Sequence, residues 1–213
     1  MTNELLNRLR GLRVVPVIVL EDAAGAVPLA RALAEGGLPC AEVTFRTGAA
    51  AESIRRMRDA VPEMLVGAGT VLTPAQAAQA RDAGAAFVVA PGFSPAVVDW
   101  CLEHDVPVCP GVCTPTEIEQ ALGRGLRVVK FFPAEAVGGL PLLRALAAPY
   151  TELSFMPTGG ITRANLGAYL AFDRVVACGG SWMAPGEWLR AGEFGRVRDE
   201  AAATVASLRG GGL

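Results

Sequence analysis

The sequence predicts a single-domain α/β protein, a compact (β/α)8 barrel spanning residues 1–213. Short β-branched runs alternate with alanine-rich runs of helical spacing, roughly every 20 to 25 residues. Eight such units fit the chain, as in a TIM barrel. A proline follows a hydroxyl residue after three of the strands, at Thr73-Pro74, Ser94-Pro95 and Thr114-Pro115, which is typical of a capped helix start. A doubly wound open sheet is the alternative, but it rarely needs eight near-equal units.

The strands and helices follow from this alternation and from stop signals such as Gly36-Gly37, Pro62 and Gly84. The predicted strands cover residues 14–19, 40–46, 65–70, 87–90, 108–110, 128–132, 153–157 and 175–178. The predicted helices cover residues 23–35, 49–60, 74–83, 95–103, 115–122, 140–147, 163–170 and 188–208, and the glycine-rich tail is expected to fray.

Composition excludes several classes of protein. Apolar residues make up 52% of the chain, charged residues 19%, and the formal net charge is -2. This balance predicts a globular protein that binds neither nucleic acid nor a membrane surface. The longest apolar stretch, residues 14–20, is too short to span a bilayer, and the N-terminal residues lack the apolar segment of a signal peptide. We therefore expect a cytoplasmic protein.

Metal and disulfide chemistry are not expected. The five cysteines are an odd number without Cys-x-x-Cys spacing, and most lie in or beside apolar runs. The single histidine, His104, lies in a charged run that resembles a helix end. A histidine-rich metal site cannot be built from this chain, so we expect neither a metal nor a cofactor.

Lys130 is the strongest functional signal. It is the only lysine in the chain, and the other 18 of the 19 basic residues are arginines. It lies inside a predicted apolar strand. A lysine can release its proton and become a nucleophile, whereas arginine stays charged. The pattern indicates that this position needs an amine. The alternative is a strand-end lysine whose stem reaches solvent.

Polar residues gather at the carboxyl ends of the predicted strands, where barrels carry their chemistry. On the second strand Glu42, Thr44 and Arg46 share one face, which we expect to point into the barrel mouth. Thr70 follows the third strand. A structural ion pair between Glu42 and Arg46 is the alternative explanation.

Glycine pairs at the last two strands predict an anion site. Thr158-Gly159-Gly160 ends the seventh strand, and Gly179-Gly180-Ser181 ends the eighth. Glycine lets backbone N–H groups approach a ligand closely, Ser181 adds a hydroxyl donor, and barrels often bind phosphate at these two loops.

Together these residues predict a reaction. A lone amine in an apolar strand suits a Schiff base with a carbonyl substrate, and Glu42 is the natural proton shuttle. Arg46 and Thr70 are placed to hold a substrate carboxylate, and the glycine pairs to hold a phosphate. The predicted partner is therefore a small keto-acid phosphate.

The sequence also resembles a known family, the class I 2-keto-3-deoxy-6-phosphogluconate (KDPG) and 4-hydroxy-2-oxoglutarate (KHG) aldolases. The resemblance covers nearly the whole chain, and its segments are specific only in combination. The matching segments are Val15-Pro16-Val17-Ile18, Glu42-Val43-Thr44-Phe45-Arg46-Thr47, Gly67-Ala68-Gly69-Thr70-Val71-Leu72, Lys130-Phe131-Phe132-Pro133-Ala134-Glu135, Pro157-Thr158-Gly159-Gly160-Ile161 and Gly179-Gly180-Ser181-Trp182.

The resemblance implies an aldolase of the Entner-Doudoroff pathway and a homotrimer of barrels. It implies Lys130 as the Schiff-base lysine, Glu42 as the acid/base, and Arg46 and Thr70 at the pyruvate carboxylate. It places Gly159, Gly160, Gly180 and Ser181 near the phosphate. An aldolase for the galactonate epimer is an alternative, disfavoured because such relatives tend to be apolar where this chain has Thr158. A non-catalytic barrel that binds a phosphorylated ligand is a second, disfavoured because a binder has no need of a lone lysine.

Overall fold

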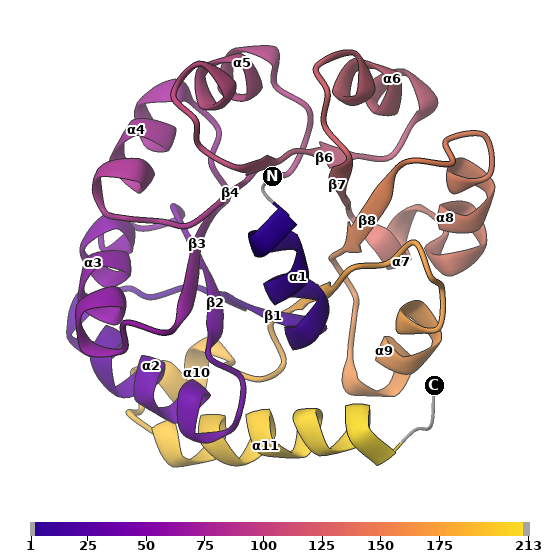
Figure 1. Cartoon of the computed structure of the whole chain (residues 1–213). Coiled ribbons are helices and arrows are strands. Elements are labelled where there is room, and N and C mark those ends of the chain that lie inside the picture. The colour runs from indigo at the N-terminus through magenta and orange to yellow at the C-terminus, as the bar shows by residue number, and fades with distance from the viewer. Residues whose placement is uncertain (1–2, 211–213) are drawn as a thin grey trace.

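A computed structural model describes residues 3–210 and has parallel strands that alternate with helices along the chain. Every strand pair is parallel, which confirms the predicted α/β class. A curled six-stranded sheet has the order β5-β4-β3-β2-β1-β9, and a three-stranded sheet the order β6-β7-β8 (Figure 1). The strands are β1 (Val14–Ile18), β2 (Cys40–Thr44), β3 (Leu65–Gly69), β4 (Val88–Val89), β5 (Val108–Cys109), β6 (Gly111–Val112), β7 (Val128–Phe131), β8 (Ser154–Pro157) and β9 (Cys178–Gly180).

The helices lie around the outside of the strands, except α1, which lies across their centre in the view of Figure 1. Within residues 3–210, no helix is long and apolar enough to cross a membrane. The helices are α1 (Asn3–Leu12), the short 3-10 helix η1 (Ala23–Gly25), α2 (Ala26–Glu35), α3 (Ala50–Ala60), α4 (Pro74–Asp82), α5 (Pro95–Glu103), α6 (Pro115–Gly123), α7 (Ala134–Val137), α8 (Gly139–Ala147), α9 (Arg163–Leu170), α10 (Gly186–Arg190) and α11 (Phe194–Gly210).

Pro110 divides the predicted fifth strand into β5 and β6. Proline has no N–H to donate to a sheet ladder, so the ladder loses one donor at Pro110. The carbonyl of Pro110 still accepts a hydrogen bond from the Lys130 amide at 2.8 Å. The chain therefore pairs with β4 before Pro110 and with β7 after it. Isolated bridges, Phe155 to Val175 and Thr158 to Gly179, link β8 to the β9 segment.

Two further predictions are wrong in position. The last strand was expected at residues 175–178, from its valines, but β9 covers Cys178–Gly180 because its register with Val14 to Pro16 of β1 decides the pairing. The single helix expected over residues 188–208 is two helices, α10 and α11, separated by a turn at Gly192 with φ +68°. Helices α1 and α7 were not predicted. The end of the glycine-rich tail, residues 211–213, lies outside the described residues.

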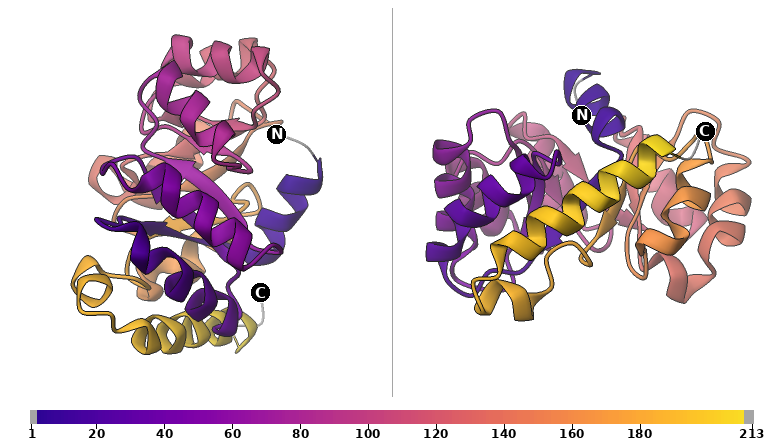
Figure 2. Two further views of the ribbon diagram at one scale, coloured as in Figure 1. Left: turned by 90° about the vertical axis from the view of Figure 1, so that its left-hand side faces the viewer. Right: turned by 90° about the horizontal axis from the view of Figure 1, so that it is seen from below.

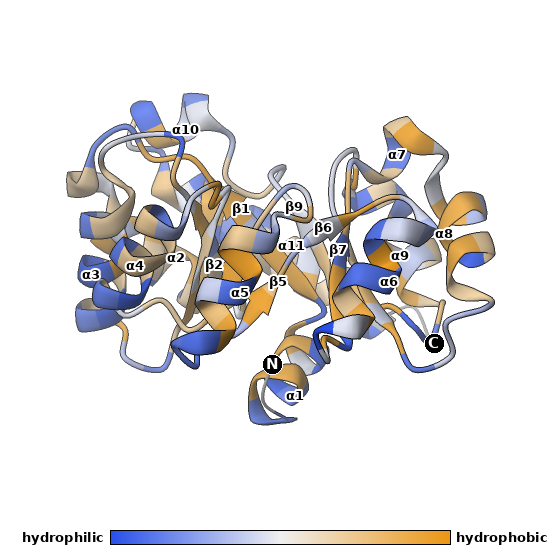
Figure 3. Ribbon diagram, turned by 90° about the horizontal axis from the view of Figure 1, so that it is seen from above, coloured by the Kyte–Doolittle hydropathy of each residue, from blue (hydrophilic) through white to orange (hydrophobic). Residues whose placement is uncertain are grey.

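The core has two layers. The larger layer lies between the strands and the surrounding helices, and Figure 3 shows apolar strands inside helices whose outer faces are polar. The second layer fills the interior of the curled sheet. Leu5 and Leu9 of α1 pack there against first residues of strands such as Cys40, Leu65 and Val128. Helix α1 therefore closes the amino end of the strands, and Figure 2 shows it standing out from the ring on one side.

Strand alternation then determines what points into the interior nearer the carboxyl end. Side chains two residues apart on a strand share a face. Glu42 lies two residues beyond Cys40, and Lys130 two residues beyond Val128, so both point inward above the apolar layer. The packed apolar end leaves the carboxyl end as the open end of the interior.

Candidate active site

Lys130 and Glu42 meet in the interior, although 88 positions separate them in the chain. Lys130 Nζ lies 3.3 Å from Glu42 Oε1. Lys130 is 5% exposed and Glu42 is 0% exposed, so both charged groups are withdrawn from bulk water. Charges are rarely buried unless they are paired, and a buried pair is weak evidence for added stability. An amine beside a carboxylate is suited to nucleophilic attack with proton transfer.

Glycines on the neighbouring strands allow close packing around this pair. A Cβ at Gly69, on the neighbouring strand β3, would lie 2.0 Å from Glu42 Oε1. Gly111 is in register with Lys130, and a Cβ there would lie 2.0 Å from the Pro91 carbonyl oxygen. A side chain at Gly69 would displace the Glu42 carboxylate, whereas Gly111 lets the strand beside Lys130 pass close to the Pro91 backbone.

The second carboxylate oxygen of Glu42 is buried without a partner. Among the described residues no donor contacts Oε2. A buried polar atom without a hydrogen bond costs free energy, so such an atom needs an explanation. An oxygen that accepts a proton from a water or a substrate hydroxyl would provide one. The Lys130 ammonium also lies 5.2 Å from the centre of the Phe132 ring, which forms another side of the site.

A buried thiol lies near the pair but is not a competing nucleophile. Cys109, at the end of β5, belongs to the interior apolar layer. Burial raises the pKa of Cys109 to about 12; Lys130 lowers it and Glu42 raises it. The thiol therefore stays protonated at neutral pH, and thiolate is the reactive form.

The other predicted residues of the second and third strands have mixed placements. Thr44 is buried, and its hydroxyl donates to the Ile18 carbonyl at 2.9 Å, so it is structural. The inward alternation does not extend to Arg46, because β2 ends at Thr44 and Arg46 lies in an exposed turn. Glu42 is paired with Lys130 rather than with Arg46, so the alternative of a structural ion pair between Glu42 and Arg46 is wrong. Thr70 directly follows β3 with φ +50°, a conformation strained for a β-branched residue.

The glycine turn after β8 presents free backbone amides. Gly159 and Gly160 have φ values of +96° and +79°. The carbonyls of Thr158 and Gly159 accept from the amides of Ala134 and Glu135 at 2.8 and 3.0 Å. Within residues 3–210, the amides of Gly159 and Gly160 have no acceptor in hydrogen-bonding range. Two consecutive free amides of this kind form an anion-binding concavity.

The second glycine pair belongs to a strand rather than to a loop. Gly179 and Gly180 lie in β9, in register with residues of β1, and exposed Ser181 follows them. A Cβ at Gly179 would lie 2.4 Å from the Oγ1 of buried Thr158. Gly179 therefore makes room for Thr158, and Ser181 is the residue of this segment that is open to a ligand.

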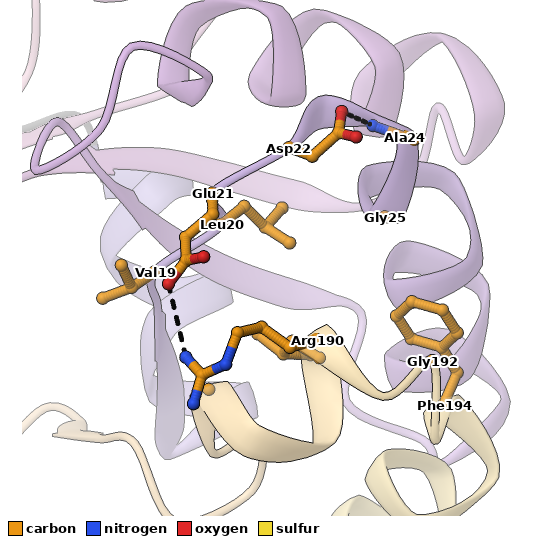
Figure 4. Close-up of a pocket in the computed structure, with 11 residues that line it drawn as sticks. Val19, Leu20, Glu21, Asp22, Ala24, Gly25, Arg190, Gly192 and Phe194 are labelled. Carbon is orange, nitrogen blue, oxygen red and sulfur yellow. Dashed lines mark hydrogen bonds and ion pairs between the residues drawn. The ribbon is translucent and has the colours of Figure 1, made fainter.

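A pocket of about 420 Å³ lies elsewhere on the surface, between the segment after β1 and helices α10 and α11. Figure 4 shows Glu21 and Arg190 facing each other there, with 3.3 Å between Oε1 and Nη1. Neither Lys130 nor Glu42 lines this pocket, so chemistry rather than cavity size identifies the candidate site. In the part of the chain that the structure describes, no group of three or more His, Cys, Asp and Glu residues is placed to hold a metal ion.

Sequence reasoning missed three contributors to the site. Gly69 leaves room for the Glu42 carboxylate, Gly111 lets the strand beside Lys130 pass close to Pro91, and the Phe132 ring faces the Lys130 ammonium. The alternation of Gly67 and Gly69 with Ala68 on a predicted strand was a signal for the first, because glycine inside a strand often marks a close approach.

Comparisons with known proteins point to one family. The family model described as KDPG and KHG aldolase matches residues 5–199. A 2-dehydro-3-deoxy-phosphogluconate aldolase of Treponema pallidum (strain Nichols) is 55% identical over 193 residues, which are 91% of this chain and 92% of that protein. A KHG/KDPG aldolase of Escherichia coli (strain K12) is 45% identical over 184 residues, 86% of each chain.

A solved structure adds a chemical observation. The KDPG aldolase of Legionella pneumophila, with pyruvate captured at low pH as a covalent carbinolamine intermediate, superposes with a TM-score of 0.89 and 36% identity. The match covers 93% of this chain and 97% of that one.

Proposed function

The chain belongs to the KDPG and KHG aldolase family, and we propose that it cleaves KDPG into pyruvate and glyceraldehyde 3-phosphate through a Schiff base at Lys130. It is an aldolase, a lyase. The observation that supports the proposed mechanism is the buried pair in which Glu42 Oε1 lies 3.3 Å from Lys130 Nζ. No other lysine is present in the chain to supply the amine.

Schiff-base formation comes first. The unprotonated Lys130 amine attacks the C2 ketone of the substrate and forms a carbinolamine. Glu42, through a water, moves protons between nitrogen and oxygen until the C2 hydroxyl leaves as water. The product is a cationic iminium joined to Lys130. This iminium serves as the electron sink for the cleavage step.

Carbon–carbon cleavage follows. Glu42 takes the proton of the C4 hydroxyl, the C3–C4 bond breaks, and its electrons move into the iminium to form an enamine. Glyceraldehyde 3-phosphate leaves as the aldehyde product. Protonation of the enamine at C3 and addition of one water to the resulting iminium release pyruvate and restore the Lys130 amine. The same sink suits KHG cleavage to pyruvate and glyoxylate.

The two charged ends of the substrate have different partners. We place the pyruvate carboxylate at Arg46 and Thr70, because a guanidinium binds a carboxylate with two parallel hydrogen bonds. We place the phosphate at the free amides of Gly159 and Gly160 and at the Ser181 hydroxyl. Gly179 and Gly180, which have no side chains, let the backbone of β9 approach the phosphate closely. Thr158, at the buried base of the turn, favours the gluconate substrate over the galactonate epimer.

The same proposal extends to architecture and assembly. We infer that the two sheets act as one (β/α)8 barrel, since only Pro110 separates β5 from β6 and two bridges connect β8 with the β9 segment. A homotrimer in the cytoplasm remains our expectation. Exposed Leu72, 56% accessible in the single chain, is an apolar side chain that a partner subunit would cover.

Turnover of both epimers tests the substrate. We expect rapid pyruvate release from the gluconate compound, slow release from the galactonate compound, and measurable release from KHG. Equal or preferred cleavage of the galactonate compound would replace the substrate without changing the mechanism. A protein that binds both compounds and cleaves neither would be the non-catalytic binding barrel instead.

A further inference from the structure

The segment that follows Lys130 is fastened to the glycine turn after β8. Strand β7 leads into helix α7, whose first two amides donate outside their own helix. Ala134 N donates to the Thr158 carbonyl at 2.8 Å, and Glu135 N donates to the Gly159 carbonyl at 3.0 Å. Backbone hydrogen bonds therefore connect the lysine strand with the turn to which we assign the phosphate.

These bonds also orient the amides of the turn. A trans peptide unit is planar, so the carbonyl of one residue and the N–H of the next point in opposite directions. Holding the Thr158 carbonyl toward α7 turns the Gly159 N–H away from α7. Holding the Gly159 carbonyl turns the Gly160 N–H away in the same manner. The contact with α7 thus sets the direction of both amides that have no acceptor among residues 3–210.

The side chain of Glu135 makes a second connection, to helix α9. Its Oε1 accepts a hydrogen bond from the Tyr169 hydroxyl. Tyr169 is only 2% exposed and belongs to the outer core layer, so its hydroxyl has a fixed position. Because α9 begins at Arg163, shortly after the glycine turn, Glu135 holds the turn through its amide and the following helix through its carboxylate.

The surrounding backbone packs tightly against this pair. A Cβ at Gly160 would lie 2.6 Å from the Cβ of Glu135. A Cβ at Gly139 would lie 3.2 Å from Glu135 Oε1 and 3.4 Å from the Tyr169 hydroxyl oxygen. Burial first, and then Glu135, raises the pKa of Tyr169, so the phenol remains a donor throughout the neutral range.

We propose that Glu135 and Tyr169 are positioning residues, whose hydrogen bond holds the Gly159-Gly160 amides toward the substrate phosphate and so confers preference for phosphorylated substrates. Neither residue needs to touch the substrate to do this. The inference rests on the proposed function, because it assumes that the phosphate binds at this turn.

Two variants remove the hydrogen bond from opposite sides, and two serve as controls. Tyr169→Phe removes the donor and keeps the ring, whereas Glu135→Ala removes the acceptor at an exposed position and is not expected to disturb the core. Glu135→Gln keeps an acceptor oxygen and is the rescuing variant. Tyr150→Phe is the matched control. Tyr150 also donates to a glutamate, Glu119 Oε1 at 3.0 Å, but it precedes β8, whereas the glycine turn follows that strand.

Steady-state kinetics with KDPG and with KHG, which lacks the phosphate, provide the test, together with inhibition by inorganic phosphate. Loss of one hydrogen bond to a charged group corresponds to about tenfold. In Tyr169→Phe and Glu135→Ala we expect the KDPG KM and the inhibition constant of phosphate to rise by that factor. The ratio of kcat/KM for KDPG to that for KHG should fall by a similar factor. Glu135→Gln and Tyr150→Phe should stay within about twofold of the wild type.

Two results would overturn the inference: an unchanged ratio in both variants, or an equal loss on both substrates, as a merely structural role predicts. Borohydride trapping of pyruvate at Lys130 distinguishes failure of the positioning role from failure of the proposed function. If the wild type is not trapped, the proposed function fails. If trapping is normal in the wild type and in both variants but the ratio does not change, the positioning role alone fails.

Discussion

Glu42 Oε1 lies 3.3 Å from Lys130 Nζ, while Glu42 Oε2 has no donor among the described residues. One oxygen is thus engaged with the nucleophile, and the other remains for a water or a substrate hydroxyl. This division within one carboxylate is what a proton shuttle requires, because it must contact both the nitrogen and the oxygen between which protons move.

Replacing the carboxylate by its amide tests this role. Glu42→Gln keeps the shape of the side chain and removes its ability to carry a proton, so we expect turnover to fall by about 10² to 10⁴. The fall should appear in kcat more than in KM, because the lost interaction acts in the proton-transfer steps. A decrease of less than about fivefold would mean that Glu42 is structural and that another group moves the protons.

The contact between Gly69 and Glu42 gives a second prediction. The methyl group of Gly69→Ala would lie 2.0 Å from Glu42 Oε1, so the flexible carboxylate must move away from Lys130. We expect kcat to fall by about 100-fold, since small displacements of catalytic groups have effects of this size. Gly123→Ala, where a Cβ meets no atom within 4 Å, is the control and should retain activity. Wild-type turnover in a folded Gly69→Ala protein would show that the position of Glu42 is unimportant.

Thr70 offers a test of strain retained for function. Its φ of +50° is costly for a β-branched residue, whereas glycine adopts it without steric cost. We expect Thr70→Gly to raise the free energy of unfolding by about 1 kcal/mol and to raise the KM of the substrate, because the variant lacks the hydroxyl that we assign to the substrate carboxylate. Denaturant unfolding and steady-state kinetics measure the two effects.

Asp105 provides the matched control for strain, with φ +55° in an exposed turn before β5. Asp105→Gly should raise stability in the same way and leave KM unchanged. If Thr70→Gly and Asp105→Gly behave alike in both measurements, Thr70 has no role in binding.

The local parts of this fold were predictable from the sequence, whereas contacts between distant parts were not. Helices α5 and α9 have the predicted bounds, because local signals such as Pro95 at the first position of α5 mark where they begin. The last strand was predicted too early in the chain, at residues 175–178 instead of Cys178–Gly180, because its register with β1 depends on residues far away in the chain. Strand pairing of this kind overrides local β propensity.

The same distinction applies to the site. Strand alternation and the isolation of one lysine indicated Lys130 and Glu42, and the structure places them side by side. The same alternation predicted an inward Arg46, but β2 ends at Thr44 and Arg46 lies in the turn that follows. The spaces left by glycines, and the hydrogen bond between Glu135 and Tyr169, join positions that no local pattern connects.

Assembly can be measured directly. The apolar composition of 52% and exposed Leu72 suggest that a single chain leaves apolar surface for partners to cover. We expect light scattering at micromolar concentration to give three times the 22.1 kDa mass of one chain. A monomeric mass would contradict the trimer and leave the chemistry at Lys130 unaffected.

The covalent role of Lys130 is the central claim, and borohydride reduction in the presence of pyruvate tests it most directly. An iminium would be reduced to a stable secondary amine, and because Lys130 is the only lysine, one peptide map distinguishes it from the N-terminal amine. We expect labelling of the Lys130 peptide in the wild type. Lys130→Arg should lose both labelling and aldol cleavage, since arginine keeps its proton. An active wild type that is not labelled at Lys130, or an arginine variant that still turns over, would contradict the account.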